Sequence, residues 1–278
     1  MSVATLAEAL TPALQEGYAL AGLVVLGWED AVCYTEAGNQ AGLPIILQAG
    51  PGCRRHTPLP VLGKMFRHLA ETANVPVVCH LDHGNTLEEV RIAIDCGFSS
   101  VMFDGSKLPL IDNIKQTAKA AQLAHDAGVS IEGEIGYVGY DDGAISNPTV
   151  PEEARQIAKE AGLDALAVSI GNTHLQTEQK AEIDLDQLSA IEQATPVPLV
   201  IHGGSGVPAD IRKNLAHNSH ICKFNIGTET RQLFGAGVKQ YLTDHPNAFD
   251  RLEILQAQMP ALTAATKQII QNFGPAKT

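Results

Sequence analysis

Three histidines stand at or just after the ends of apolar, strand-like runs, where they could bind one metal ion together. His83 follows the run that ends at Leu81, and His174 and His202 follow two later runs of the same kind. Three neutral imidazoles with an open fourth position form the usual catalytic Zn²⁺ site, with Zn–N distances of about 2.0–2.1 Å. Any one of these histidines alone is more readily explained as a hydrogen-bonded residue at a strand end. Their coincidence indicates a metal centre.

Carboxylates accompany these histidines. Asp82 directly precedes His83, and near a divalent cation it would stay ionised and could exchange a proton with an alkoxide as general acid and base. The alternative is that Asp82 orients a metal-bound imidazole. Asp104 and Glu134 also end strand-like runs and could bind the metal at a displaced position. Because a catalytic zinc site keeps one position free, we favour a role for both in orienting the imidazoles.

Two glycine-rich segments follow the last two strand-like runs, HGGSG at His202–Gly206 and NIGT at Asn225–Thr228. Glycine lets backbone N–H groups approach the oxygens of an anion, and Ser205 and Thr228 add hydroxyl donors. Either segment alone would be explained as a tight turn. The two together indicate a phosphate site.

A regular alternation of short apolar runs and amphipathic helical segments must position these residues. Nearly continuous apolar runs are typical of parallel strands covered on both faces. The predicted strands are 23–26, 43–49, 75–81, 99–103, 129–135, 165–170, 197–201 and 221–226. Eight strand–helix units without a linker predict an α/β fold, a (β/α)8 TIM barrel that takes in residues 1–278 as one domain.

Such a barrel would bring the candidate residues together, because active sites lie at the carboxyl ends of the strands and phosphate often binds after the last two. We expect a helix at Val3–Glu16 to cap the other end and Gln256–Phe273 to form an extra C-terminal helix. A doubly wound open sheet is the alternative fold. It would need a glycine-rich GxGxxG turn after the first strand, whereas the segment Leu26–Asp30 reads LGWED.

Composition excludes several classes of protein. The chain has 278 residues and a formal charge of −12, which disfavours a nonspecific nucleic-acid binder. Its longest apolar stretch, near 19–28, is shorter than a membrane helix, and its N-terminus lacks the features of a secretory signal. We expect a cytoplasmic protein that binds neither nucleic acid nor membrane, with its five scattered cysteines as free thiols.

Six segments carry more specific motifs: HLDHG (80–84), GFSSVMFDGSKLPL (97–110), IEGEIG (131–136), the turn 171–174, IHGGSG (201–206) and KFNIGTE (223–229). They resemble the class II, metal-dependent ketose-bisphosphate aldolases, the family of the fructose- and tagatose-bisphosphate aldolases. The resemblance runs from about Leu43 to the C-terminus, and the first strand matches poorly.

The resemblance implies a zinc-dependent aldol reaction of a sugar phosphate. His83, His174 and His202 would bind one Zn²⁺ ion, a Lewis acid for dihydroxyacetone phosphate. Loss of a C–H proton would give a zinc-bound enediolate hydrogen-bonded by Asn225, and Asp82 would exchange a proton with the aldehyde oxygen. Na⁺ or K⁺ is expected near the phosphate. The expected substrate and phosphate residues are Gly171, Gly203, Gly204, Ser205, Asn225, Gly227 and Thr228.

The chain departs from the family in the loop whose acid removes the C–H proton. The family loop usually reads GGxED, and here residues 139–143 read GYDDG. Asp142 aligns best with the family's acid, although Asp141 is also a candidate. Tyr140 replaces a hinge glycine.

Other departures concern the second substrate. Gly50 stands where the family has Ser or Thr, and residues 26–28 lack the family's Phe-Asn pair. We therefore expect the dihydroxyacetone phosphate half of the site to be retained and the aldehyde half to be remodelled. The aldehyde would either lack a phosphate or carry another anion that Arg54 or Arg55 meets.

Two other functions stay open. A Schiff-base aldolase would use Lys107 or Lys223 and no metal, which would leave the three histidines without a purpose. A non-catalytic sugar-phosphate-binding barrel is favoured only by the altered loop. We expect a homodimer or homotetramer, because helices at Thr228–Leu242 and Gln256–Phe273 are amphipathic and members of the family are dimers or tetramers. The sequence does not specify the aldehyde or the stereochemistry of the new bond.

Overall fold

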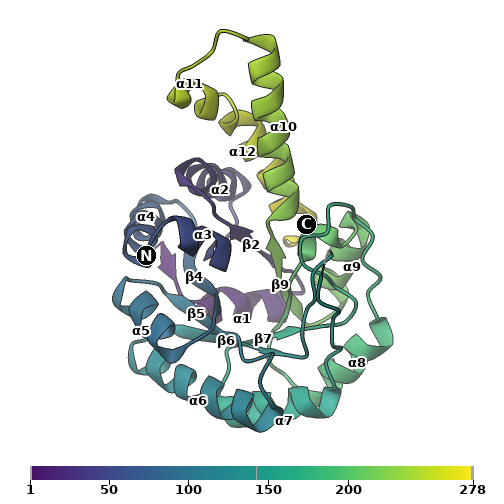
Figure 1. Ribbon diagram of the computed structural model, residues 1–278. Coiled ribbons are helices and arrows are strands. Elements are labelled where there is room, and N and C mark those ends of the chain that lie inside the picture. Colours follow the sequence, from purple (N-terminus) through teal and green to yellow (C-terminus); the bar gives the residue numbers. More distant parts are fainter. Residues whose placement is uncertain (1, 142, 277–278) are drawn as a thin grey trace.

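The computed structural model describes residues 2–141 and 143–276 and confirms the (β/α)8 barrel (Figure 1). Each barrel strand pairs in parallel with the next along the chain, and the last pairs with the first to close the barrel. The strands are β2 (Leu20–Val24), β3 (Ile45–Ala49), β4 (Val77–Gly84), β5 (Ser100–Phe103), β6 (Ser130–Ile135), β7 (Ala165–Val168), β8 (Leu199–Ile201) and β9 (Ile221–Ile226). Their carboxyl ends meet at one mouth.

Helices cover the outside of the barrel, and apolar side chains fill the layer between helices and strands. They are α2 (Trp28–Ala41), α4 (Leu59–Thr72), α5 (Leu87–Asp95), α6 (Leu110–Asp126), α7 (Pro151–Ala161), α8 (Leu185–Ala194), α9 (Ala209–Asn218) and α10 (Thr228–Asp244). The short helix α3 (Pro51–His56) lies at the carboxyl ends of the strands instead. Nearly every strand residue is buried, as the continuous apolar runs predict.

The amino ends of the strands are closed by the N-terminal segment. Thr5 caps α1 (Leu6–Glu16): its hydroxyl accepts a hydrogen bond from Glu8 N, and Glu8 accepts one from Thr5 N. Leu6 and Leu10 pack in one cluster with inward-facing residues of the strands. The predicted cap is confirmed, but the helix starts later than Val3, because Val3–Ala4 forms the short strand β1 against β4.

The first barrel strand begins earlier than predicted. It spans Leu20–Val24 rather than 23–26 and runs through Gly22. A Cβ atom at Gly22 would lie 1.7 Å from Gln48 Oε1, so the buried Gln48 side chain requires glycine there. In a sequence, a glycine within an apolar run indicates a break, and this displaced the predicted strand.

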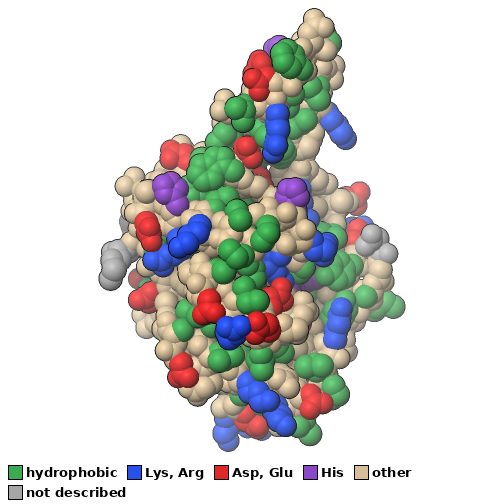
Figure 2. Space-filling model, turned by 60° about the vertical axis from the view of Figure 1, so that its left-hand side comes forward, with side chains coloured by type: hydrophobic (Ala, Val, Ile, Leu, Met, Phe, Trp, Pro, Cys, Tyr) green, Lys and Arg blue, Asp and Glu red, His purple; other side chains and the backbone are tan. Residues whose placement is uncertain are grey.

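The predicted extra C-terminal helix is confirmed as α12 (Met259–Phe273), which starts slightly later than Gln256 and packs against α2. The short helix α11 (Arg251–Gln256), which was not predicted, precedes it. The outer part of α10 and α11 projects from the barrel as an arm (Figure 1). Figure 2 shows hydrophobic side chains along this arm, where Leu242, Phe249 and Leu252 are exposed. None of the described helices combines the length and the apolar character needed to cross a membrane.

Candidate active site

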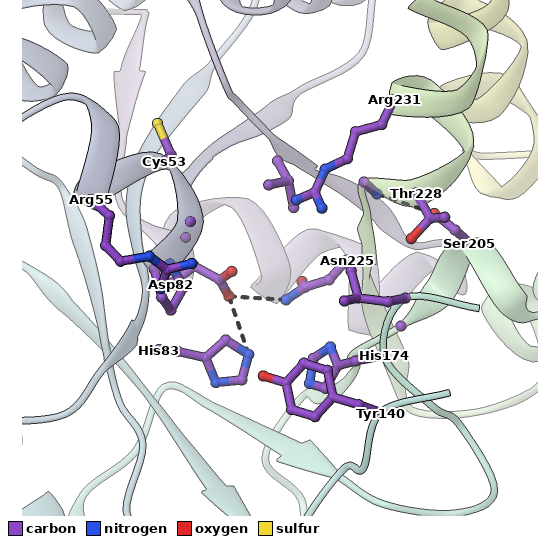
Figure 3. A pocket seen from close by; sticks show the side chains of 17 residues that line it. Cys53, Arg55, Asp82, His83, Tyr140, His174, Ser205, Asn225, Thr228 and Arg231 are labelled. Atoms are coloured by element: carbon purple, nitrogen blue, oxygen red, sulfur yellow. Dashed lines mark hydrogen bonds and ion pairs between the residues drawn. The ribbon is translucent and has the colours of Figure 1, made fainter. Parts of the chain in front are cut away.

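A pocket opens at the carboxyl ends of the strands (Figure 3). Its walls come from the ends of β2, β4 and β9 and from the loops that follow β3, β6, β7 and β8. Asp82 and His83 lie at the end of β4, and Tyr140 lies on the loop after β6. The predicted site is therefore a real concavity at the predicted end of the barrel.

The three predicted metal ligands converge at this site: His83 and His174 line the pocket, and His202 is fully buried beside them. The ring centroids lie 5.2 Å apart for His83 and His174, 4.6 Å for His83 and His202, and 5.6 Å for His174 and His202. One nitrogen from each ring lies within 4.8 Å of the others. Three segments far apart in the sequence thus place three imidazoles around one point.

Carboxylates hold two of these rings so that one nitrogen of each stays available. His83 Nδ1 lies 2.7 Å from Asp104 Oδ2, and His83 Nε2 forms no hydrogen bond in the described structure and lies 4.0 Å from Asp82 Oδ1. His202 Nε2 lies 3.1 Å from Glu132 Oε1, and its buried Nδ1 has no hydrogen-bond partner in the described structure. This donor set fits a metal ion, because metal-binding imidazoles characteristically pair their second nitrogen with a carboxylate.

Glu134 lies close to two of the three histidines. Its Oε2 atom is buried without a hydrogen bond, 3.4 Å from His202 Nδ1 and 3.7 Å from His83 Nδ1. His83, Asp104 and Glu134 form a second group with the spacing of metal ligands. The geometry thus leaves both predicted roles open for Glu134, while Asp104 holds His83.

The charges of the rings follow from these contacts. Burial disfavours the charged form of His202, but Glu134 and Glu132 outweigh it and raise its pKa to about 10. Burial and the neighbouring His83 and His202 hold the pKa of His174 well below its usual range. Burial opposes the ionisation of Asp104, but His83 lowers the pKa of this carboxyl well below its usual range. Asp104 is therefore ionised at neutral pH.

Asp82 faces the pocket beside Asn225. Asn225 Nδ2 donates to Asp82 Oδ1 over 3.1 Å, whereas Asn225 Oδ1 is buried without a partner. Burial would raise the pKa of Asp82, but His83 and His202 outweigh it and lower the pKa. Asp82 is thus an ionised carboxylate at the mouth, as a residue that first accepts a proton should be.

Arg54 fixes the end of β4. Its guanidinium donates to the carbonyl oxygens of Ala49, Asp82 and His83 and pairs with Glu89 at 2.9 Å. This side chain is therefore engaged and does not reach a substrate. Of the two arginines expected near the aldehyde, Arg55 is the one that lines the pocket.

The two glycine-rich segments form one wall of the pocket. Gly203, Ser205, Gly227 and Thr228 line it, and the Ser205 hydroxyl accepts from Gly227 N at 3.1 Å. Gly203 has φ +64°, and a Cβ there would lie 2.1 Å from Thr173 O, so the turn requires glycine. The start of α10 adds backbone N–H groups to this wall, which suits an anion.

Two predicted substrate residues are absent from the pocket walls. Gly204 packs against β9, where a Cβ would lie 3.0 Å from Asn225 O. Gly171 has φ +101°, and a Cβ there would lie 1.9 Å from Glu182 O. Both positions therefore require glycine for structural reasons.

Asp142, the predicted loop acid, lies outside the described residues. The neighbouring Asp141 pairs with Lys180, with 3.7 Å between Asp141 Oδ1 and Lys180 Nζ.

Below the histidines lies a buried polar network that the sequence analysis missed. Lys223 Nζ lies 2.6 Å from Glu132 Oε2 and 3.4 Å from His80 Nε2, and His80 Nδ1 lies 2.8 Å from Ser100 Oγ. Burial opposes the ionisation of Glu132, but Lys223 outweighs it and lowers its pKa. Burial and Lys223 lower the pKa of His80 to about 3. The sequence feature that could have revealed this network is the alternation of polar residues along three strands.

This network bears on the Schiff-base alternative. Lys223 is wholly buried and paired with Glu132, and so lacks the free amine that an imine requires. Lys107 lies over the ring of Tyr137, 5.3 Å from its centroid, and does not line the pocket. Neither lysine is placed as a Schiff-base nucleophile.

Comparisons with known proteins show which family the chain is similar to. A profile of the family described as "Fructose-bisphosphate aldolase class-II" matches residues 4–278. A fructose-bisphosphate aldolase of Giardia intestinalis is 31% identical over 304 residues, which cover 99% of this chain and 94% of the relative. That of Staphylococcus epidermidis is 31% identical over 282 residues, covering 99% and 98%. The crystal structure of the YdjI aldolase from Escherichia coli K12 has a TM-score of 0.85 at 29% identity and covers 98% of both chains.

We predict that Lys223→Met destabilises the protein by about 3–5 kcal/mol, because it leaves the Glu132 charge buried and unpaired. Adding Glu132→Gln removes that charge and should restore part of the loss. The control is Lys180→Met, which breaks an exposed pair and should change stability by less than about 1 kcal/mol. Urea unfolding at pH 7 measures all three. Equal effects of the two lysine substitutions would contradict a structural role for the buried pair.

Proposed function

The chain belongs to the class-II fructose-bisphosphate aldolase family, whose members are lyases, and from this premise we propose a more specific activity. The protein reversibly cleaves a ketose phosphate into dihydroxyacetone phosphate and an aldehyde, with the help of one zinc ion. The observation that carries the proposal is the convergence of three imidazole nitrogens within 4.8 Å, beside Asp82 and the glycine-rich wall.

His83 Nε2, His202 Nδ1 and one nitrogen of His174 would hold the zinc ion. When bound, Zn²⁺ supplies a Lewis acid that polarises the carbonyl and hydroxyl oxygens of dihydroxyacetone phosphate. Asp104 and Glu132 keep two rings in the orientation that this role needs. The expected Na⁺ or K⁺ ion stays a prediction from the family.

Two aspartates divide the proton transfers in this proposal. Asp142 removes the C–H proton of dihydroxyacetone phosphate, and the resulting enediolate accepts a hydrogen bond from Asn225. In cleavage the ionised Asp82 accepts the proton of the substrate hydroxyl as the carbon–carbon bond breaks, and in the reverse direction the protonated carboxyl returns this proton to the aldehyde oxygen as the bond forms. The hydrogen bond between Asn225 and Asp82 keeps the two side chains next to each other for these steps.

The phosphate binds at the wall formed by Gly203, Ser205, Gly227 and Thr228. The opposite part of the pocket, for the aldehyde, holds Arg55, whereas Arg231 extends from α10 on the phosphate side, next to Gly227 (Figure 3). Neither forms an ion pair with an acidic side chain within the described part of the chain. The unpaired guanidinium group of Arg55 suits a planar anion such as a carboxylate, and the missing hydroxyl at Gly50 disfavours the family's usual phosphate.

Exposed apolar residues of the α10–α11 arm, Phe249 above all, support the expected homodimer or homotetramer, in which a second copy would cover them. The cytoplasmic location stays a prediction from composition.

We predict that the protein exchanges one C–H proton of dihydroxyacetone phosphate in D₂O without any aldehyde present. NMR should show stereospecific loss of one signal, abolished by a chelator and restored by Zn²⁺, and metal analysis should find one zinc per chain. Exchange that ignores the chelator would point instead to a lysine imine. A protein that retains zinc but never exchanges the proton would support a non-catalytic sugar-phosphate-binding barrel.

The same assay should distinguish the roles of Asp142 and Asp82. Asp142→Asn should abolish proton exchange, whereas Asp82→Asn should retain it and lose about 10²–10⁴-fold in cleavage of the ketose phosphate. Asp141→Asn is the matched comparison, since this carboxylate faces Lys180 and not the pocket. Loss of exchange in Asp141→Asn but not in Asp142→Asn would reverse the assignment.

The residues of the pocket that would contact the aldehyde predict which aldehydes the enzyme prefers. In kinetics with a panel of aldehydes, those that carry a carboxylate should exceed neutral ones in kcat/KM, and Arg55→Ala should remove most of this advantage. Arg155→Ala, which breaks an exposed pair on α7, is the control. A clear preference for glyceraldehyde 3-phosphate over unphosphorylated aldehydes would contradict the remodelled pocket.

A further inference from the structure

Tyr140 lies over the metal position although none of the steps above uses it. Its ring stacks on the imidazole of His174, with centroids 5.0 Å apart and planes inclined by 27°. Figure 3 shows its hydroxyl directed across the pocket toward His83. The side chain lines the pocket and is 40% exposed, so one face packs on His174 while the rest faces the cavity.

The backbone holds this ring in place. Tyr140 and His174 form a β-bridge between two loops: His174 N donates to Gly139 O at 2.8 Å, and Asp141 N donates to His174 O at 3.1 Å. Tyr140 N donates to Ala144 O at 2.9 Å. A Cβ at Gly139 would lie 2.1 Å from the same carbonyl oxygen, so this close approach requires glycine. The stacked position is therefore built into the loop.

The phenol is a hydrogen-bond donor rather than a base. A tyrosine hydroxyl carries one O–H donor, and a phenol ordinarily keeps this proton at neutral pH. In the described structure the hydroxyl forms no hydrogen bond with protein, and it points into the pocket. A neutral O–H group held over a sugar-binding cavity can donate to an oxygen of the bound molecule.

We propose that Tyr140 is a specificity-determining residue, which donates a hydrogen bond to a hydroxyl group of the aldehyde half and forms the wall beside His174. The inference rests on the proposed function, since it assumes that the phosphate occupies the opposite wall. Asp82 already serves the reacting oxygen, so the partner of Tyr140 is a hydroxyl farther along the aldehyde. The ligand class is a polyhydroxylated aldehyde rather than a deoxy one.

Two nonreactive ligands test this without turnover. Glycerol 3-phosphate fills only the phosphate half, and a straight-chain hexitol 1-phosphate extends into the aldehyde half. With zinc-loaded protein in calorimetry, Tyr140→Phe should weaken hexitol phosphate about tenfold and leave glycerol 3-phosphate unchanged. Tyr137→Phe is the matched control, because this tyrosine is on the same loop but outside the pocket walls. It should bind both ligands as the wild type does.

The outcomes separate this inference from the proposed function. Unchanged binding of hexitol phosphate by Tyr140→Phe would overturn the role of the hydroxyl, and equal weakening of both ligands would show that Tyr140 acts through His174 instead. Failure of the wild type to bind either phosphate would overturn the proposed function. In kinetics, Tyr140→Phe should reduce by about tenfold the preference for a hydroxylated aldehyde over its deoxy analogue. Proton exchange into dihydroxyacetone phosphate should stay unchanged.

Discussion

The ion pair between Glu132 and Lys223, inside the barrel, is the interaction on which the mouth depends. Both side chains are fully buried and 2.6 Å apart, and a lone charge in such surroundings would cost several kcal/mol. Each charge therefore requires the other. The second oxygen of Glu132 lies against His202 Nε2, which turns Nδ1 of that ring toward the other imidazoles. A contact deep in the barrel thus determines which atom His202 presents at its mouth.

The same strands that carry this network also carry the site one layer above it. Residues two apart on a strand point to the same side, so each strand contributes one residue to each layer. The strand pairs are His80 with Asp82 on β4, Glu132 with Glu134 on β6, and Lys223 with Asn225 on β9. A slip in register by one residue would turn both layers away from the interior together. The layer proposed to do chemistry therefore takes its geometry from the ion-paired layer.

Sequence patterns predicted the barrel and the meeting of the three histidines, because both follow from regular periodicity and from the rule that strand ends converge. The same patterns missed the strand start at Leu20, since the need for Gly22 arises from Gln48 on the neighbouring strand. They also left Arg54 and Arg55 equivalent, although one is bound to carbonyl oxygens and the other faces the pocket. Such distinctions depend on contacts between distant segments, which no local spacing records.

The two halves of the pocket are built on different kinds of structure. The wall proposed for the phosphate lies at the end of β9, at the start of α10 and on the tight turn after β8, and is formed mainly by backbone. The side proposed for the aldehyde is formed by side chains from loops and the short helix α3, among them Tyr140 and Arg55. Rigid elements suit dihydroxyacetone phosphate, the substrate half that does not change, whereas loops can change to fit another aldehyde while the barrel stays intact.

The β-bridge from Tyr140 to His174 connects the proposed aldehyde side to the proposed metal site, because a shift of this loop would also move His174. A change in aldehyde specificity at Tyr140 is therefore constrained by the geometry that the proposed metal site requires.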